Sequence, residues 1–372
     1  MRRIKTFDII RGWCMSMMVW GHMLSWWMIS QDRWLTSALH SIFGDIVGIG
    51  FLFISGLSTV LLFRSRIMKV GVSIDYSVDQ VRNEYLFRAL LILIIAVGYN
   101  SVISLGTLDL LNIWKWYIPL TIAISLLLTF PLLNISRSYR LLIALGFWIS
   151  HYYILSLLLP YQGQANIFGV LYHFLYNTKG LHPILCYFSF FLIGTVIGDV
   201  IFEIYLKNDQ NERRKAIKSE IILPSLIIGS ILIIIGILSL FPSFLTHATV
   251  SSTVYSLGVI LISTSVLLTI EEFDAIKVER SYRFFFYFSY YSFSIYFVHN
   301  VLYFILFKRV NALTIWIFTP VTFLVIIYLL RVIYTNFKDR ASIKAYLGRL
   351  SVRLAVYIKE RSENNNIEKG MI

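Results

Sequence analysis

Apolar segments long enough to cross a lipid bilayer recur along this chain. A transmembrane helix needs about 20 mostly apolar residues to cover a hydrocarbon core roughly 30 Å thick. About ten segments meet that length. The sequence therefore predicts an all-α, polytopic membrane protein with about ten transmembrane helices. The segments are 7–29, 42–63, 86–106, 116–134, 140–160, 183–206, 220–241, 249–270, 283–307 and 312–335.

The composition agrees with a membrane protein and argues against other classes. Hydrophobic residues make up 58% of the 372 positions and charged residues 14%, which is too apolar for a typical soluble domain. The 2 cysteines, Cys14 and Cys186, lie in apolar segments and cannot form a disulfide framework. We attribute the net charge of +13 to basic cytosolic loops rather than to nucleic-acid binding.

Basic residues favour alternate loops, which predicts the orientation of the chain. Lys and Arg collect on the cytosolic side of membrane proteins, so we expect a multi-pass protein of the plasma (cell) membrane with both termini cytosolic. The first segment follows Arg2 and Arg3 but contains Arg11 and no small-residue cleavage site, so we expect a retained helix. The basic residues expected inside are Arg64, Arg66, Lys69, Arg82, Arg88, Arg137, Arg140, Lys207, Arg213, Arg214, Lys215, Lys218, Lys277, Arg280 and Arg283. Those expected outside are Arg33, Lys115, Lys179, Lys308 and Arg309.

The C-terminal part differs in pattern from the apolar segments, and we divide the chain into a transmembrane domain, 1–335, and a cytosolic tail, 336–372. Apolar tail residues recur every three or four positions with basic residues between them, which is typical of an amphipathic helix on the inner leaflet. The last residues, from Asn364, are expected to be disordered. The apolar positions are Ile343, Leu347, Leu350, Leu354 and Ile358, and the basic ones are Lys344, Arg349, Arg353 and Lys359.

Polar residues within the apolar segments are the candidates for function. A charged side chain inside the membrane costs roughly 2.5–3.5 kcal/mol on insertion scales, so it is rarely accidental. Arg11 and His22 are 11 positions apart, which places them on one helical stripe about 16 Å apart. His22 and His299 should both lie about 24 Å from the cytosolic face. Asp45 should lie near the outer end of the second segment.

These residues suggest an acid/base site. His22, His299 and His40, which we place in the loop before the second segment, are candidates for proton transfer. Asp45 and Tyr296 are candidate substrate-binding residues. A structural role remains open for each group: Asp45 as a helix cap, and His299 in hydrogen bonds with Tyr296, Asn300 or Ser294. We regard His173, His182 and His247 as incidental and His151 as a buried hydrogen-bonded residue. We expect no metal site, because no set of His, Asp or Glu residues has the spacing of metal ligands.

The basic residues after the second segment have two interpretations. Arg64, Arg66 and Arg88 fit an ordinary positive-inside signal, and they also suit the phosphates of a cytosolic donor. Asp8 is grouped with this donor-binding set, although its position one turn before Arg11 also fits a simple ion pair. In the stretch from Phe51 to Ser58, small residues at helical spacing favour close helix packing.

Three motifs resemble known membrane acyltransferases. The run Asp8-Ile9-Ile10-Arg11-Gly12 followed by His22 resembles the opening of the acyltransferase-3 family. The start from Arg3 to Gly12 and the stretch from Gly44 to Gly56 resemble more closely the heparan-α-glucosaminide N-acetyltransferase family. The stretch from Tyr291 to His299 resembles a segment common to both. The likeness covers residues 1–65 and this late helix.

The resemblance implies a cytosolic acyl-CoA donor, acetyl-CoA or another, whose acyl group passes to an amine or hydroxyl of a sugar or glycan across the membrane. By this resemblance, Arg11 and His22 match residues of the family motif, and Asp45 matches an acidic position near the acceptor site. The heparan enzymes place their key histidine in the loop before that Asp, where this chain has Leu35, and the nearest loop histidine is His40. Whether His22 or His40 is the base therefore stays open.

The sequence thus favours an acyl-CoA-dependent membrane acyltransferase. His22 would deprotonate the acceptor or carry the acyl group, and Arg11 would hold the donor. The expected partners are acyl-CoA, a sugar or glycan acceptor and membrane lipids, without nucleic acid and without a metal; a homodimer is left open. The alternative is a secondary transporter with a proton-coupled His/Asp/Arg site, against which the chain shows no inverted repeat. A third hypothesis is that the protein is a non-catalytic assembly or lipid-scaffold protein.

Overall fold

The computed structural model describes residues 3–70, 76–177, 182–273 and 282–370. Within these ranges the chain forms helices and no strand, which confirms the all-α prediction. Lys179, Lys277 and Arg280, used above for the orientation, lie outside the described residues. The helices are α1 (Lys5–Trp27), α2 (Arg33–Val70), α3 (Val78–Thr107), α4 (Ile118–Thr129), α5 (Arg137–Leu158), α6 (Ile167–Tyr176), α7 (Ile184–Tyr205), α8 (Gln210–Ala216), α9 (Leu223–Leu238), α10 (Val250–Glu272), α11 (Arg283–Tyr290), α12 (Ser292–Val298), α13 (Ile315–Phe337) and α14 (Ile343–Gly370).

Each segment expected to cross the membrane contains helix, but fewer of them than expected are long and apolar enough to span a bilayer. Among the described residues, 7 helical stretches are long and apolar enough to span a bilayer, so the protein is a multi-pass membrane protein. The segment 116–134 forms a shorter apolar helix. Helix α1 is not among the 7, in keeping with the polar Asp8, Arg11 and His22 within it.

The segment 283–307 is the main correction to the predicted spans. It is not one helix: α11 ends at Tyr290, α12 runs from Ser292 to Val298, and a 3₁₀ helix follows from His299 to Phe304. The polar groups at these breaks bind the chain before α14, since Tyr291 donates to the Lys338 carbonyl and Ser294 to the Ala341 carbonyl. Apolar periodicity alone does not reveal such breaks.

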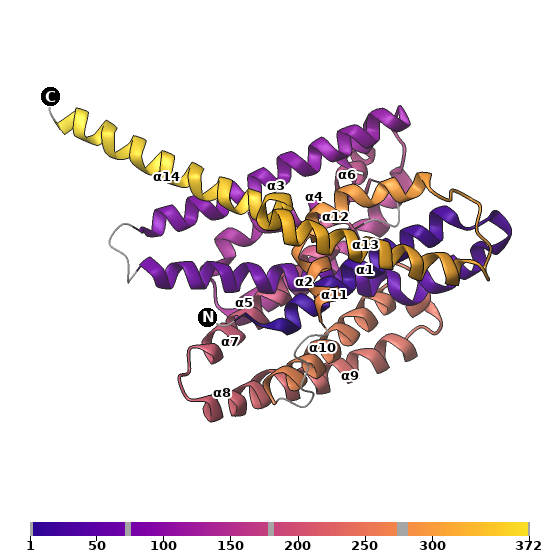
Figure 1. Cartoon of the computed structure of the whole chain (residues 1–372), viewed down its shortest axis with the longest axis horizontal. Helices are drawn as coiled ribbons and strands as arrows, with labels where there is room; N and C mark the ends of the chain where they lie inside the picture. The colour runs from indigo at the N-terminus through magenta and orange to yellow at the C-terminus, as the bar shows by residue number, and fades with distance from the viewer. Residues whose placement is uncertain (1–2, 71–75, 178–181, 274–281, 371–372) are drawn as a thin grey trace. The chain divides into compact units, whose positions relative to one another are not determined.

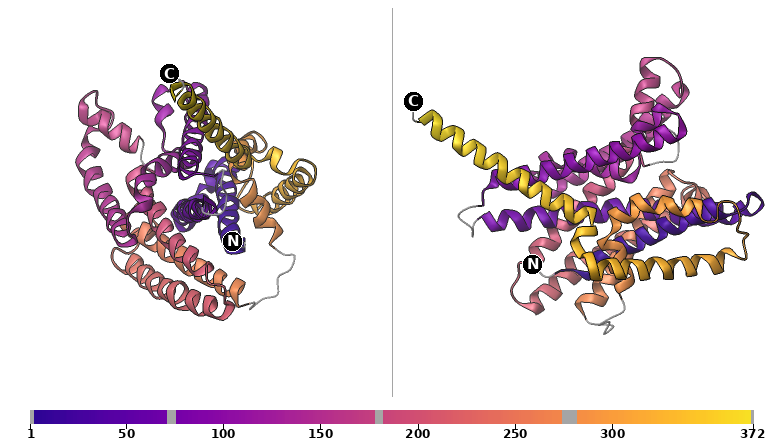
Figure 2. Two further views of the ribbon diagram at one scale, coloured as in Figure 1. Left: turned by 90° about the vertical axis from the view of Figure 1, so that its left-hand side faces the viewer. Right: turned by 45° about the horizontal axis from the view of Figure 1, so that its top comes forward.

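The contacts divide the chain into two compact units. The first comprises Met1–Ile54 and Glu203–Lys344, and the second comprises Ser55–Phe202 and Ala345–Ile372. In the first unit, α1 packs against α10, α11 and α12, and α9 packs along α10 (Figure 1). Figure 2 shows the α9–α10 pair side by side from two further directions. The helices approach closely because Gly229 of α9 faces Gly258 of α10.

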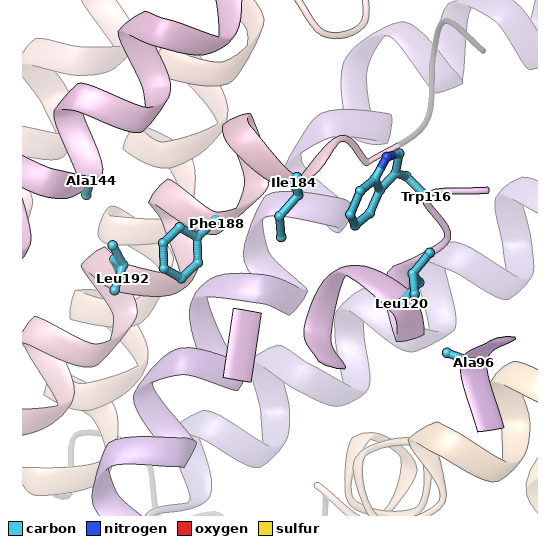
Figure 3. Close-up of a cluster of buried hydrophobic side chains, with 7 residues drawn as sticks. All are labelled: Ala96, Trp116, Leu120, Ala144, Ile184, Phe188 and Leu192. Carbon is cyan, nitrogen blue, oxygen red and sulfur yellow. The ribbon is translucent and has the colours of Figure 1, made fainter. Parts of the chain in front are cut away.

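The core of the second unit joins α3, α4, α5 and α7. Figure 3 shows its buried side chains, which include three from one face of α7. Gly56 of α2 lets the α7 backbone approach, because a Cβ atom there would stand 2.0 Å from the carbonyl oxygen of Phe191. This contact confirms the close packing predicted around Gly56. The core residues are Ala96, Trp116, Leu120, Ala144, Ile184, Phe188 and Leu192.

Among the described residues, the helices α6, α8 and α14 lie outside the predicted spans. Helix α6 occupies the loop 161–182, where Asn166 caps its start by accepting from the Gly169 amide and Asn177 follows its end at φ 56°. Helix α14 lies in the predicted tail and extends to Gly370, past the position at which disorder is expected. Leu347 and Ala355 of α14 are buried, whereas Tyr346 and Tyr357 are exposed.

Candidate functional site

Arg11 and Asp8 form the ion pair that the sequence left as the simpler interpretation. Their closest charged atoms, Arg11 Nη1 and Asp8 Oδ1, are 3.8 Å apart, and Ser289 of α11 donates to the same carboxylate oxygen at 3.0 Å. Arg3 donates to the other oxygen at 2.6 Å. The carboxylate of Asp8 is therefore occupied by side chains of its own unit, and its charge offsets that of Arg11.

His22 and His299, which the sequence predicts to lie at one depth, are next to each other. Their ring centroids are 4.9 Å apart, and Trp26 stacks on both rings at 4.9 Å from His22 and 5.6 Å from His299. The indole nitrogen of Trp27 donates to the Leu302 carbonyl at 2.6 Å, which fixes the 3₁₀ helix against the end of α1. The end of α1 and the 3₁₀ helix, which this hydrogen bond joins across 275 positions of the chain, thus form one aromatic cluster.

The hydrogen bonding of His299 defines its basic nitrogen. Nδ1 lies 2.6 Å from the carbonyl oxygen of Tyr296, which can only accept, so Nδ1 carries the proton. Nε2 is then the nitrogen with the lone pair, and it has no hydrogen-bond partner among the described residues. Tyr296 is buried with its ring centroid 5.7 Å from that of His299. The hydrogen bond to Tyr296 that was considered as a structural role for His299 is therefore present, but through the Tyr296 backbone carbonyl.

A cavity of about 320 Å³ lies near the C-terminal end of α1. Its lining combines imidazoles with hydroxyl groups, all within the first unit. His40 lines it, but His22 does not. We call it the His40–His247 cavity, and its lining residues are Ser25, Thr36, Ser37, His40, Ser41 and His247.

Two expectations about this region are wrong. Helix α2 begins at Arg33, more than two turns before Asp45, so His40 lies in a helix rather than in a loop and Asp45 cannot cap the helix start. Instead, Asp45 is buried and its Oδ1 lies 2.5 Å from Nδ1 of His247. His247, regarded above as incidental, is the residue that sequence reasoning missed. In the sequence, His247 follows the segment that ends at 241, and this position is the indication that it could lie at the same membrane level as Asp45.

The donor-binding candidates Arg64, Arg66 and Arg88 lie in the second unit. Nε of Arg64 donates to Asp199 at 2.9 Å, and Arg140 bonds the same carboxylate. Two guanidinium groups thus share the single negative charge of Asp199, which leaves one positive charge in excess. Arg88 is partly buried.

Arg66 is held differently, by the buried carboxylate of Glu84. Tyr76 donates a second hydrogen bond to this carboxylate at 2.9 Å. Burial, together with this hydrogen bond to Glu84, raises the pKa of Tyr76 to about 12, so the phenol remains a donor at neutral pH. Among the described residues no group of three or more His, Cys, Asp or Glu is arranged to hold a metal ion.

Comparison with known proteins identifies one family. The model of the heparan-alpha-glucosaminide N-acetyltransferase catalytic domain matches residues 3–241, which include the helices from α1 to α9. No individual curated protein and no solved structure matched the chain. The match does not extend to acyltransferase-3 proteins, the other family suggested by the motifs.

Proposed function

Because the chain belongs to the heparan-alpha-glucosaminide N-acetyltransferase family, we propose that it is a membrane acetyltransferase that transfers an acetyl group from acetyl-CoA to a sugar. The acceptor atom is an amine nitrogen or a hydroxyl oxygen of a sugar or glycan on the far side of the membrane from the donor. Membership implies a transferase, and the helices place it in a membrane. Heparan itself is not implied.

The observation that carries this proposal is the His40–His247 cavity. Its volume of about 320 Å³ is in the range of small-molecule sites, which are typically about 300–1,000 Å³. Hydroxyl side chains both donate and accept hydrogen bonds, as sugar hydroxyls do, and imidazoles can take up a proton at neutral pH. A site of this composition suits a sugar ring that must lose a proton during the reaction.

Acetyl transfer needs one bond to form and one to break. The acceptor nitrogen or oxygen attacks the thioester carbonyl, a C–N or C–O bond forms, the C–S bond breaks, and the CoA thiolate leaves with the proton that a base has removed. His40 lines the cavity and contacts the acceptor. His22 stacks on Trp26, lies beside His299, and is about one turn from the cavity residue Ser25.

The donor's phosphates require positive charge, and we place them near Arg64, Arg66 and Arg88. The excess positive charge around Asp199 supports this placement, since about 30% of the Arg64 side chain is exposed. The Arg11 side chain is only 14% exposed and lies beside Asp8 and Ser289, which favours a role in orienting α1 rather than in binding phosphate. An Arg88→Gln change should raise the KM for acetyl-CoA several-fold with little change in kcat.

The test is transfer by purified protein in lipid nanodiscs. Radiolabelled acetyl-CoA is offered with hexosamine acceptors, and labelled product and free CoA are measured together. We expect His22→Ala and His40→Ala each to lower transfer strongly, because His40 lines the acceptor cavity and His22 lies about one helical turn from its residue Ser25. His173→Gln, on α6, is the matched control.

The transporter alternative predicts the reverse pattern. A proteoliposome that takes up a sugar without acetyl-CoA, and wild-type protein that releases no CoA with any acceptor, would contradict the acetyltransferase proposal. Full transfer by His22→Ala would remove His22 from the mechanism while leaving the function in place.

A further inference from the structure

We infer that His247, held by Asp45, is the general base that takes the proton from the acceptor during acetyl transfer. The inference rests on the proposed function and adds a catalytic residue to it. His247 lies between α9 and α10, about 200 positions after Asp45 in α2, and beyond the residues that the family model matches. Only the folded first unit brings the two together.

The Asp45–His247 pair fixes which nitrogen is basic. Nδ1 of His247 lies 2.5 Å from Oδ1 of Asp45, and a carboxylate only accepts, so Nδ1 carries the proton. In a neutral ring the lone pair then belongs to Nε2. A buried carboxylate on Nδ1 also stabilises the imidazolium that forms when Nε2 takes a proton. Asp45 is 5% exposed and the His247 side chain 24% exposed, so solvent screens this interaction only in part.

The backbone after His247 is arranged to keep the pair in place. The Ala248 amide donates to Oδ2 of Asp45 at 2.9 Å, so each carboxylate oxygen has its own partner. Ala248 adopts φ 59°, a left-handed conformation that is unfavourable for a non-glycine residue. Strained residues of this kind collect at functional sites, where the surrounding structure holds them. This strain directs the amide and the His247 ring at the same carboxylate.

His247 reaches the acceptor because it lines the cavity. The titratable groups that face it are Asp45 and His40, whose ring centroid lies 6.2 Å from that of His247. Asp45 bonds His247, so the oriented imidazole is His247, and His40 on the facing side contacts the substrate. The His40 ring lies over Gly44, where a Cβ atom would stand 3.2 Å from its Cδ2.

The proton balance is complete without another reactant. Nε2 of His247 removes one proton from the acceptor amine or hydroxyl as that atom attacks the thioester carbonyl. The C–S bond then breaks and the CoA thiolate accepts that proton from the His247 imidazolium. His247 returns to the neutral form with its proton on Nδ1, still bonded to Asp45.

The experiment combines kinetics with a readout that does not need turnover. His247→Gln, His247→Ala, Asp45→Asn and the His173→Gln control are compared in nanodiscs for kcat and KM. We expect His247→Gln to lower kcat about 10²–10⁴-fold with little change in the KM for acetyl-CoA. Added imidazole should restore part of the activity of His247→Ala, which a merely structural defect would not allow.

Nitrogen-15 NMR of histidine-labelled protein tests Asp45 as a positioning residue. In the wild-type protein the His247 signals should report the Nδ1–H tautomer, and Asp45→Asn should shift the ring toward a mixture of tautomers. If wild-type protein transfers no acetyl group, the proposed function fails whatever the NMR reports. If the wild type is active and His247→Gln retains full kcat, the inference about His247 fails alone.

Discussion

The carboxylate of Asp199 illustrates how single residues are held in this protein. It is buried and bonds both Arg64 and Arg140, and Arg140 is only 1% exposed. Arg140 also donates to Thr195 at 3.1 Å, whereas its Nε has no partner among the described residues. A buried guanidinium depends on its carboxylate partner, because an unpaired buried charge is very costly.

Loss of the Asp199 charge should therefore destabilise the protein strongly. We expect Asp199→Asn to cost roughly 3–5 kcal/mol, because Arg140 would remain buried without its counter-charge. Thermal unfolding in detergent measures the change. The control is Glu220→Gln, since Glu220 and Lys207 form an exposed pair 3.9 Å apart and exposed pairs contribute little. Equal melting temperatures for Asp199→Asn and the wild type would contradict this role.

At the scale of the helices, glycines determine how closely neighbours approach. A Cβ atom at Gly12 of α1 would stand 2.1 Å from the backbone carbonyl oxygen of Phe285 in α11. Gly21, on the same helix, has nothing within 4 Å of that position. Small residues at helix contacts are the usual basis of packing in membranes, where apolar burial alone does not hold helices together.

The two glycines give a matched pair of substitutions. Gly12→Ala should separate α1 from α11 and lower the melting temperature, because a backbone atom cannot move aside as a side chain can. Gly21→Ala should leave the melting temperature unchanged or raise it, since Ala has the higher helix propensity by about 1 kcal/mol. A Gly12→Ala protein as stable as Gly21→Ala would show that α1 and α11 do not pack in this way.

For the molecule as a whole, the distribution of basic loops predicts the sidedness of the chain. The loop before α8 should face the cytosol, and the loop after α5 should face the opposite side. Asn208 and Gln162 are exposed residues of these two loops. Both native cysteines, Cys14 and Cys186, are buried and can be replaced by Ala to give a background without thiols.

Thiol labelling of single-cysteine variants measures this sidedness. In intact cells an impermeant maleimide should label Gln162→Cys but not Asn208→Cys, and permeabilised cells should label both. Labelling of Asn208→Cys from outside would invert the orientation. It would also place the proposed donor and acceptor sites on the wrong sides of the membrane.

From local sequence patterns one can recognise the helical membrane class and the family resemblance, and one can predict that His22 and His299 lie at one level. These follow from local quantities, namely the length of an apolar run, a short motif and the rise of about 1.5 Å per helical residue. The same arithmetic could not foresee that α2 begins at Arg33 or that the segment 283–307 breaks, because helix ends depend on contacts with distant residues.

Which polar groups meet depends on how the helices assemble. Asp8 could be paired with Arg11 from sequence because one helical turn separates them. Asp45 and His247 could not, because their contact depends on how α2, α9 and α10 pack and on the left-handed turn at Ala248. The sequence of a single apolar segment says little about which helix it packs against. The partner of a buried carboxylate is therefore known only once the arrangement of the helices is known.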